Sequence, residues 1–263
     1  NKGYAGGNSV HANGYGPRGG PGGAPHGGFG GMGYGADINS IYPCGDALAP
    51  EWPGSGGGKN GGGYGGGAIR IDATSGVVTV IGTITANGQN YVISQASSGA
   101  GGSISITCKT IAGTGVIRAN GGSTAPWGAN GSGGRIAVRY DPPAQGGMPP
   151  PAIQYSVLPG GLPPPADRSS GYNQLQADIG TVHFPDAALL CDPINVSGQI
   201  LLDGLSWAPN RLTISNQWIR FPQEGFRLTV SNDVTILKGA TVGRLDIGAS
   251  VLTNFGVGTT GGA

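Results

Sequence analysis

The chain has little charge, few cysteines and no long apolar run. Charged residues make up 10% of its 263 positions, and the formal net charge is +1. Binding to nucleic-acid phosphates requires a stripe of Lys and Arg, so the composition excludes nucleic acid as an expected partner. No run of 18 apolar residues occurs, so we expect no membrane span.

Motifs for catalysis and for metal binding are also scarce. The three His residues are widely separated, no Cys/His set has zinc-site spacing, and no Gly-x-Ser-x-Gly elbow occurs. The sequence therefore predicts no catalytic residues and no resident cofactor. One metal hypothesis stays open, because Asp37, Asp46 and Glu51 are close enough in sequence to share a loop that binds Ca²⁺. The competing interpretation is that these are solvated loop carboxylates.

Three cysteines are present, and their settings differ. Cys108 has the same alternation as Ile104 and Ile106, so we expect it to point inward. Cys44, in "YPCGD", and Cys191, in "LLCDP", lie in loop-like sequence. A disulfide between Cys44 and Cys191 is compatible with an extracellular protein, and free thiols are the alternative.

Glycine and proline are abundant, with 56 and 20 residues. Residues 1–67 are so rich in both that a helix is excluded there. We expect a glycine-rich region of polyproline-II-like loops packed on a scaffold, with a disordered region as the alternative. Both ends of the chain are glycine-rich, and the first residue is not Met, so we expect an excised piece of a larger protein.

Strand-like alternation begins at residue 68 and repeats. "AIRI", "SISI" and "RIAV" each follow a Gly-rich triplet. The stretch from Val78 to Gly88 matches the stretch from Ile111 to Gly121, which gives a repeat of about 33 residues. Short repeated strands cannot bury their apolar faces alone, whereas stacked copies can. The pattern over 68–140 therefore predicts an all-β fold, a parallel β-helix or β-solenoid with long glycine-rich loops.

The second half of the chain changes character twice. Residues 141–171 are Pro-rich and indicate a linker or strap. Residues 172–263 indicate a second β-solenoid zone, because "RLTISN" at Arg211, "RLTVSN" at Arg227 and "RLDI" at Arg244 recur at a spacing of about 16–17 residues. Stacked in this way, the three guanidinium groups would form an outward ladder suited to an acidic polysaccharide. Ordinary turn-flanking Arg residues are the alternative.

Asparagine recurs at one position of the repeat. Asn13, Asn87 and Asn120 each stand in "ANG". Asn tolerates left-handed turn conformations and stacks into hydrogen-bonded ladders, so we interpret these residues as a structural turn ladder rather than as catalytic groups.

These motifs carry a family resemblance over roughly residues 12–140. The series "PGSGGG", "GGGAIRI", "GTITANG", "GAGGSISI", "GTGVIRANGG" and "GSGGRIAV" resembles glycine-rich repeat proteins of bacterial secreted or cell-surface type, with relatives in plants. The resemblance implies a β-helical fold and an extracellular location. It implies no catalytic residue, because the family is largely uncharacterised.

The sequence therefore favours an extracellular structural or adhesive module that associates with itself or with neighbouring segments into fibres or matrix. A carbohydrate-binding module is the alternative, with Trp127 and the three Arg residues as its candidates, since flat aromatic faces bind sugar rings. A polysaccharide-active enzyme is supported only by analogy between folds.

Overall fold

The computed structural model describes residues 2–8, 13–17, 22–32, 41–59, 61–91, 96–124, 128–161, 176–237 and 244–247. Its first elements are β1 (Ala68–Val80), β2 (Thr83–Thr85), β3 (Ser103–Gly113), β4 (Val116–Arg118), β5 (Arg135–Arg139), α1 (Pro142–Gly146), β6 (Gln154–Ser156) and β7 (Thr181–Phe184). There follow the 3-10 helix η3 (Ala187–Leu189), β8 (Val196–Leu202), β9 (Ser206–Trp207), β10 (Leu212–Ile214), β11 (Trp218–Phe221), β12 (Arg227–Leu228), β13 (Val234–Ile236) and β14 (Arg244–Ile247).

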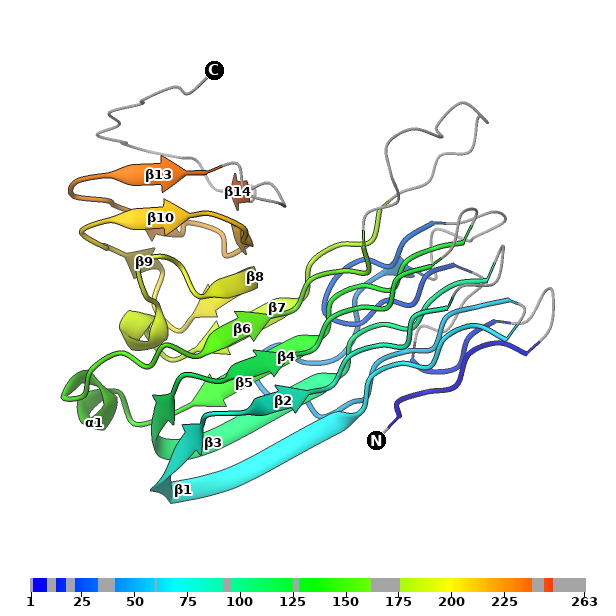
Figure 1. The fold of residues 1–263 in the computed structure, drawn as a ribbon, viewed down its shortest axis with the longest axis horizontal. Coiled ribbons are helices and arrows are strands. Elements are labelled where there is room, and N and C mark those ends of the chain that lie inside the picture. Colours follow the sequence, from blue (N-terminus) through cyan, green and yellow to red (C-terminus); the bar gives the residue numbers. More distant parts are fainter. Residues whose placement is uncertain are drawn as a thin grey trace.

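Ten of the described strands belong to one parallel sheet, and eight of them follow one path that curls into a nearly closed, barrel-like shape (Figure 1). The order of hydrogen-bonded neighbours is β1-β3-β5-β7-β8-β6-β4-β2. The strands β1, β3, β5 and β7 thus form one wall, and β2, β4 and β6 form the other. The walls are joined at β8, which pairs with β6 through Val196 and Ser197 and with β7 through Gln199 to Leu202.

The prediction of a β-helix or β-solenoid with long glycine-rich loops is wrong. A solenoid stacks separate coils, whereas here one path of hydrogen bonds runs from β1 through both walls to β2, as in a barrel of eight parallel strands. The alternating pattern predicts that these segments are strands. It does not show that β8 is long enough to pair on both sides and join the walls.

The predicted repeat of about 33 residues is confirmed for the stretches that start at Val78 and at Ile111. β2 pairs with β4 at Ile84 and Ile117, and β1 pairs with β3 at Val78 and Ile111. The side chains that alternate inward form the core between the two walls, and Cys108 lies among them at 4% exposure, as predicted. Each fully buried Ile contributes roughly 1.5–3 kcal/mol relative to an exposed one, so the repeated Ile positions supply the main cohesion of the sheet.

Glycines occupy the places where backbones of neighbouring segments touch. A Cβ atom added at Gly102 would lie 1.9 Å from the carbonyl oxygen of Gly67, and one added at Gly134 would lie 2.2 Å from that of Gly102. These two glycines immediately precede β3 and β5. Only glycine permits this spacing, which explains why a Gly pair precedes these strands. The described parts of 2–66 pack in the same way and exchange backbone hydrogen bonds with 96–102 and 128–134.

The segment 141–171 is more than the predicted strap. It contains the short helix α1, and its strand β6 enters the main sheet between β4 and β8. The side chain of Gln145 in α1 is buried and accepts a hydrogen bond from the backbone N–H of Ile111 at 2.8 Å. No helix in the described part of the chain has the length and apolar character needed to cross a membrane.

In the C-terminal part, the predicted spacing of about 16–17 residues is wrong. Leu212 pairs with Val234, and Ser206 pairs with Arg227, so the strands stack at a longer interval than the predicted one. The alignment of "RLTISN" with "RLTVSN" matched similar letters, but the pairs that stack are "LTI" with "VTI" and "SW" with "RL". β11 pairs with β8 and with β14, and so extends the main sheet beyond β8.

Candidate functional site

The apolar interior of the sheet is incompletely covered at its β1–β2 edge. Ile69 and Ile71 of β1 lie opposite Ile104 and Ile106 of β3. Ile104 and Ile106 are 0% exposed, whereas Ile69 and Ile71 are only partly buried. The Ile side chains of β3 are therefore buried, whereas the Ile side chains at the same register in β1 are partly exposed. The reason is that, among the described strands, β1 has β3 as its only neighbour in the sheet path.

The outer side of this edge carries both apolar and charged groups. Val77 is 58% exposed and Ile81 is 75% exposed. Arg70 donates from Nε to Asp72 at 2.8 Å and from Nη1 to Glu51 at 3.3 Å. All three charged side chains are exposed, so these pairs add little stability. The exposed apolar groups of an edge strand are the more informative feature, because such edges pair with further strands.

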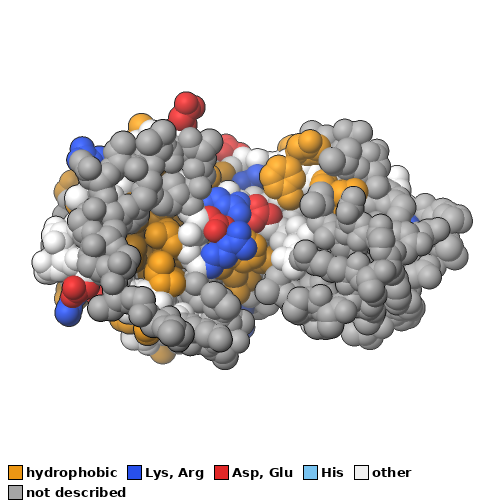
Figure 2. Space-filling view, turned by 90° about the horizontal axis from the view of Figure 1, so that it is seen from above, with side chains coloured by type: hydrophobic (Ala, Val, Ile, Leu, Met, Phe, Trp, Pro, Cys, Tyr) orange, Lys and Arg blue, Asp and Glu red, His pale blue; other side chains and the backbone are white. Residues whose placement is uncertain are grey.

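The other end of the molecule is also partly apolar. β13 pairs with β10, and Ile236 and Leu237 at its end are 50% and 48% exposed. Figure 2 is seen from this end and shows exposed apolar side chains together with a central group of basic and acidic side chains. The two ends therefore each present a strand with exposed apolar side chains.

The residues of the Ca²⁺ hypothesis have other contacts. Asp37 lies outside the described residues. Asp46 accepts the backbone N–H of Leu48 at 2.8 Å, and Glu51 is paired with Arg70. Among the described residues no group of three potential ligands from His, Cys, Asp and Glu is gathered for a metal.

Two of the three repeated Asn residues are in contact. The backbone N–H of Asn120 donates to Oδ1 of Asn87 at 2.8 Å. Oδ1 of Asn120 in turn accepts from the Ser156 hydroxyl at 2.8 Å and from the backbone N–H of Leu158 at 2.9 Å. Asn13 is exposed in the glycine-rich region. These contacts use the amide groups to join successive turns.

Sequence reasoning missed a second Asn contact. Nδ2 of Asn232 donates to Oδ1 of Asn210 at 2.8 Å, and the two strands that follow these residues, β13 and β10, are paired. The sequence does contain the matching segments "NRLTI" and "NDVTI". The alignment of "RLTISN" with "RLTVSN" has more identical residues and was therefore preferred.

The three candidate Arg residues lie on different strand pairs and do not form one ladder. Arg211, directly before β10, donates to Asp233. Arg227 is exposed on β12, which pairs with β9. Arg244 on β14 stacks over the Trp218 ring, with 4.4 Å between its guanidinium carbon and the ring centroid. Trp127, the aromatic candidate, lies outside the described residues.

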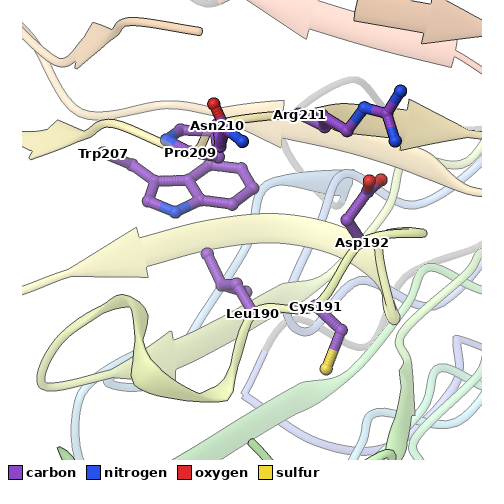
Figure 3. Close-up of a pocket in the computed structure, with 7 residues that line it drawn as sticks. All are labelled: Leu190, Cys191, Asp192, Trp207, Pro209, Asn210 and Arg211. Carbon is purple, nitrogen blue, oxygen red and sulfur yellow. The ribbon is translucent and has the colours of Figure 1, made fainter. Parts of the chain in front are cut away.

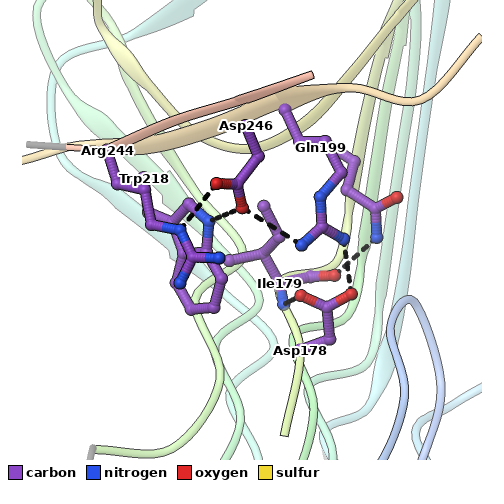
Figure 4. A network of polar contacts seen from close by, with 7 residues as sticks. Asp178, Ile179, Gln199, Trp218, Arg244 and Asp246 are labelled. Atoms are coloured by element: carbon purple, nitrogen blue, oxygen red, sulfur yellow. Dashed lines mark hydrogen bonds and ion pairs between the residues drawn. The ribbon is translucent and has the colours of Figure 1, made fainter. Parts of the chain in front are cut away.

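A network of charged groups, centred on Arg220, was not predicted. Arg220 donates from Nη1 to Asp178 at 2.5 Å and from Nη2 to Asp246 at 3.2 Å, and Asp246 also accepts from Arg244 and from the Trp218 indole N–H (Figure 4). Burial raises the pKa of Asp246, but the hydrogen bonds from Arg244 and Trp218 outweigh it and leave the pKa below its usual value. The carboxylate is thus held ionised, and the network joins β11 and β14 to the segment before β7.

The structure also gathers a thiol, an imidazole and a hydroxyl. Nε2 of His26 lies 2.9 Å from the Ser103 hydroxyl, which donates its own proton to the carbonyl oxygen of Trp52 at 2.6 Å. His26 therefore carries its proton on Nε2, and its bare Nδ1 faces the Cys44 sulfur at 3.8 Å. Burial, together with the charge of Arg135, lowers the pKa of His26 to about 3. So weak a base does not ionise a thiol at neutral pH, and the cluster ties loops together.

The three cysteines, all of which lie in the described part of the chain, form no disulfide. Cys44 contacts His26, whereas the Cys191 sulfur lies 3.4 Å from the Pro151 carbonyl oxygen. Of the two alternatives that the sequence left open, a Cys44–Cys191 disulfide and free thiols, the structure has free thiols. Burial raises the pKa of the Cys191 thiol. A raised pKa keeps a thiol protonated and unreactive.

A scan against protein-family models found no match, and searches of curated proteins and of solved structures found no similar protein. The geometry of the described residues is therefore what supports a function, and its most distinctive features are the partly uncovered β1–β2 edge and the apolar end at β13.

Proposed function

We propose that this chain is an extracellular structural or adhesive module that associates end to end with copies of itself. The observation that carries the proposal is the partial exposure of Ile69 and Ile71, whose counterparts in β3 are fully buried. A further parallel strand placed along β1 would continue the sheet and cover these side chains. The extracellular location is supported by the resemblance of the glycine-rich repeats to secreted and surface proteins.

The strand that we expect to lie along β1 is β13 at the end of a second copy of the chain. That end offers a parallel strand and the exposed Ile236 and Leu237. Contact between two different ends is heterologous, and heterologous contacts that do not close into a ring build filaments. The low net charge of +1 adds little repulsion between copies.

The test is the state of the chain across a concentration series, followed by light scattering and negative-stain electron microscopy. We expect end-to-end oligomers or filaments in the wild type. Val77→Lys combined with Ile81→Lys should reduce them, because both side chains are exposed at the edge and lysine on an edge strand opposes pairing. The matched control is Leu48→Lys, which charges an exposed apolar side chain in a loop, at 49% exposure.

A mixing experiment tests the end-to-end geometry. Ile236→Lys blocks the β13 end, as Val77→Lys with Ile81→Lys blocks the β1 edge. Each of these two variants alone should be monomeric. A mixture of the two should form dimers and nothing larger, because only one free β1 edge and one free β13 end can meet. A wild-type chain that stays monomeric at high concentration contradicts the proposal. Oligomers that survive in both blocked variants contradict the assigned surfaces.

A further inference from the structure

The described residues include a pocket of about 310 Å³ between the loop before β8 and the turn from β9 to β10. Leu190 and Trp207 supply its apolar side, and Asp192, Asn210 and Arg211 supply its polar side. Figure 3 shows the Asp192 carboxylate and the Arg211 guanidinium on one side of the pocket and the Trp207 indole on the other. The volume lies at the low end for ligand pockets, which suits one small ring.

Two of the polar side chains are exposed and already hydrogen-bonded within the protein. Asp192 Oδ1 accepts the backbone N–H of Thr213 at 2.7 Å. Arg211 donates from Nε and Nη2 to Asp233 Oδ2 at 3.3 and 3.2 Å. Such prior positioning reduces the entropy lost when a ligand binds.

The remaining side chains of the pocket are held as well. Asn210 Oδ1 accepts from Asn232 at 2.8 Å. The indole of Trp207 packs against Phe221, with 6.0 Å between the ring centroids, and is partly buried. The pocket thus combines a partly buried aromatic side chain with exposed polar groups that each have one contact within the protein.

Each polar side chain keeps one group unused by the protein. Among the hydrogen bonds of the described residues, none involves Asp192 Oδ2, Arg211 Nη1 or Asn210 Nδ2. These atoms comprise one acceptor and two donors. A hydroxyl group is both a donor and an acceptor, so neighbouring hydroxyl groups on one ring can satisfy a carboxylate oxygen and N–H donors together.

We propose that this pocket binds a single neutral sugar ring, such as the terminal hexose of a glycan. The C–H groups of the ring would contact Trp207 and Leu190, and its hydroxyl groups would contact Asp192, Asn210 and Arg211. A neutral ring fits the charges better than an acidic sugar does, because Arg211 is already paired with Asp233 and Asp192 adds a further negative charge.

This inference does not require end-to-end association. The pocket lies away from β1 and β2 (Figure 1), whereas its residues Asn210 and Arg211 bond to Asn232 and Asp233 directly before β13. Binding is therefore tested on the Val77→Lys and Ile81→Lys double variant if the wild type forms filaments, so that either proposal can fail alone.

The experiment is a titration of the labelled protein with the methyl glycosides of glucose, galactose and mannose, followed by two-dimensional NMR. We expect one of them to shift the indole N–H resonance of Trp207 with a dissociation constant in the millimolar range, as suits a small ligand. Asp192→Asn and Arg211→Gln should each weaken binding about tenfold, since each removes a charge-assisted hydrogen bond.

Arg227→Gln is the matched control, because it makes the same change at an exposed Arg outside the pocket. It should leave the dissociation constant unchanged. The spectrum of each variant without sugar shows whether the fold is intact. The proposal is overturned if none of the three glycosides shifts the Trp207 signal, if the pocket variants bind as well as the wild type, or if methyl glucuronide binds and the neutral glycosides do not.

Discussion

Ile71 of β1 lies opposite Ile106 of β3 in the parallel register, yet Ile106 is fully buried and Ile71 is only partly buried. The same side chain in the same alternation therefore contributes differently to folding, depending on whether a further strand covers it. This difference makes the edge a surface for association.

The first prediction concerns this pair. Ile106→Ala should reduce the free energy of unfolding by about 2–5 kcal/mol, because it leaves a cavity in a filled core. Ile71→Ala should cost about 1 kcal/mol, since the site can take up water. Urea unfolding of the monomeric protein measures both values. Equal losses would mean that the β1 edge is as well covered as the core.

The second prediction concerns backbone contact at glycine. Gly102→Ala should reduce the free energy of unfolding by about 1–3 kcal/mol or more, because the new methyl group overlaps the carbonyl oxygen of Gly67. Gly82→Ala is the control, since no atom lies within 4 Å of the added methyl group, and it should change stability by about 0.5 kcal/mol or less. Thermal unfolding of both variants compares them directly. A neutral Gly102→Ala would contradict the close packing of the glycine-rich segments.

The third prediction concerns the Asn contacts. Asn120→Ala removes the acceptor for Ser156 and Leu158 and should cost about 2 kcal/mol, at about 1 kcal/mol for each hydrogen bond. Asn87→Ala removes one such acceptor and should cost about half as much. Asn120→Asp keeps an oxygen at the same place and should retain most of the stability. The measurement is chemical denaturation of the three variants at neutral pH, and a larger loss for Asn87→Ala than for Asn120→Ala would contradict this assignment.

The fourth prediction concerns acid stability. The pKa of His26 is about 3 in the folded chain and about 6.5 in the unfolded chain. Above pH 6.5 both states are neutral and His26 has no effect. As the pH falls from 6.5 towards 3, only the unfolded state gains the proton, so the free energy of unfolding falls by up to about 1.4 kcal/mol per pH unit.

His26→Gln isolates this effect from that of the carboxylates. Glutamine can still donate to Ser103 but does not titrate. We expect the variant to lose less stability than the wild type between pH 6.5 and 4 when urea midpoints are compared. Parallel curves for the two proteins would show that His26 is protonated while folded.

Local pattern sufficed to predict the strands of the first half. Apolar residues at every second position, as in Ile104 and Ile106, pack on one face of a strand whatever its neighbours are. The repeat offset also predicted the pairing of Ile84 with Ile117, because a repeated unit buries its apolar face against its own copy. The Gly-rich triplets before the strands have a different cause, because Gly102 and Gly134 lie where the backbones of neighbouring segments touch.

Closure of the sheet and the candidate pocket depend on contacts between distant residues. Nothing in "VSGQILL" shows that β8 pairs on both sides and turns the expected coils into one barrel-like sheet. The spacing predicted for the C-terminal part is wrong, because strands pair where their side chains pack together and not where their sequences are most similar. Asp192 and Arg211 meet at one pocket only because the loop before β8 is hydrogen-bonded to β10 at Thr213. These two side chains come together without any motif in the sequence.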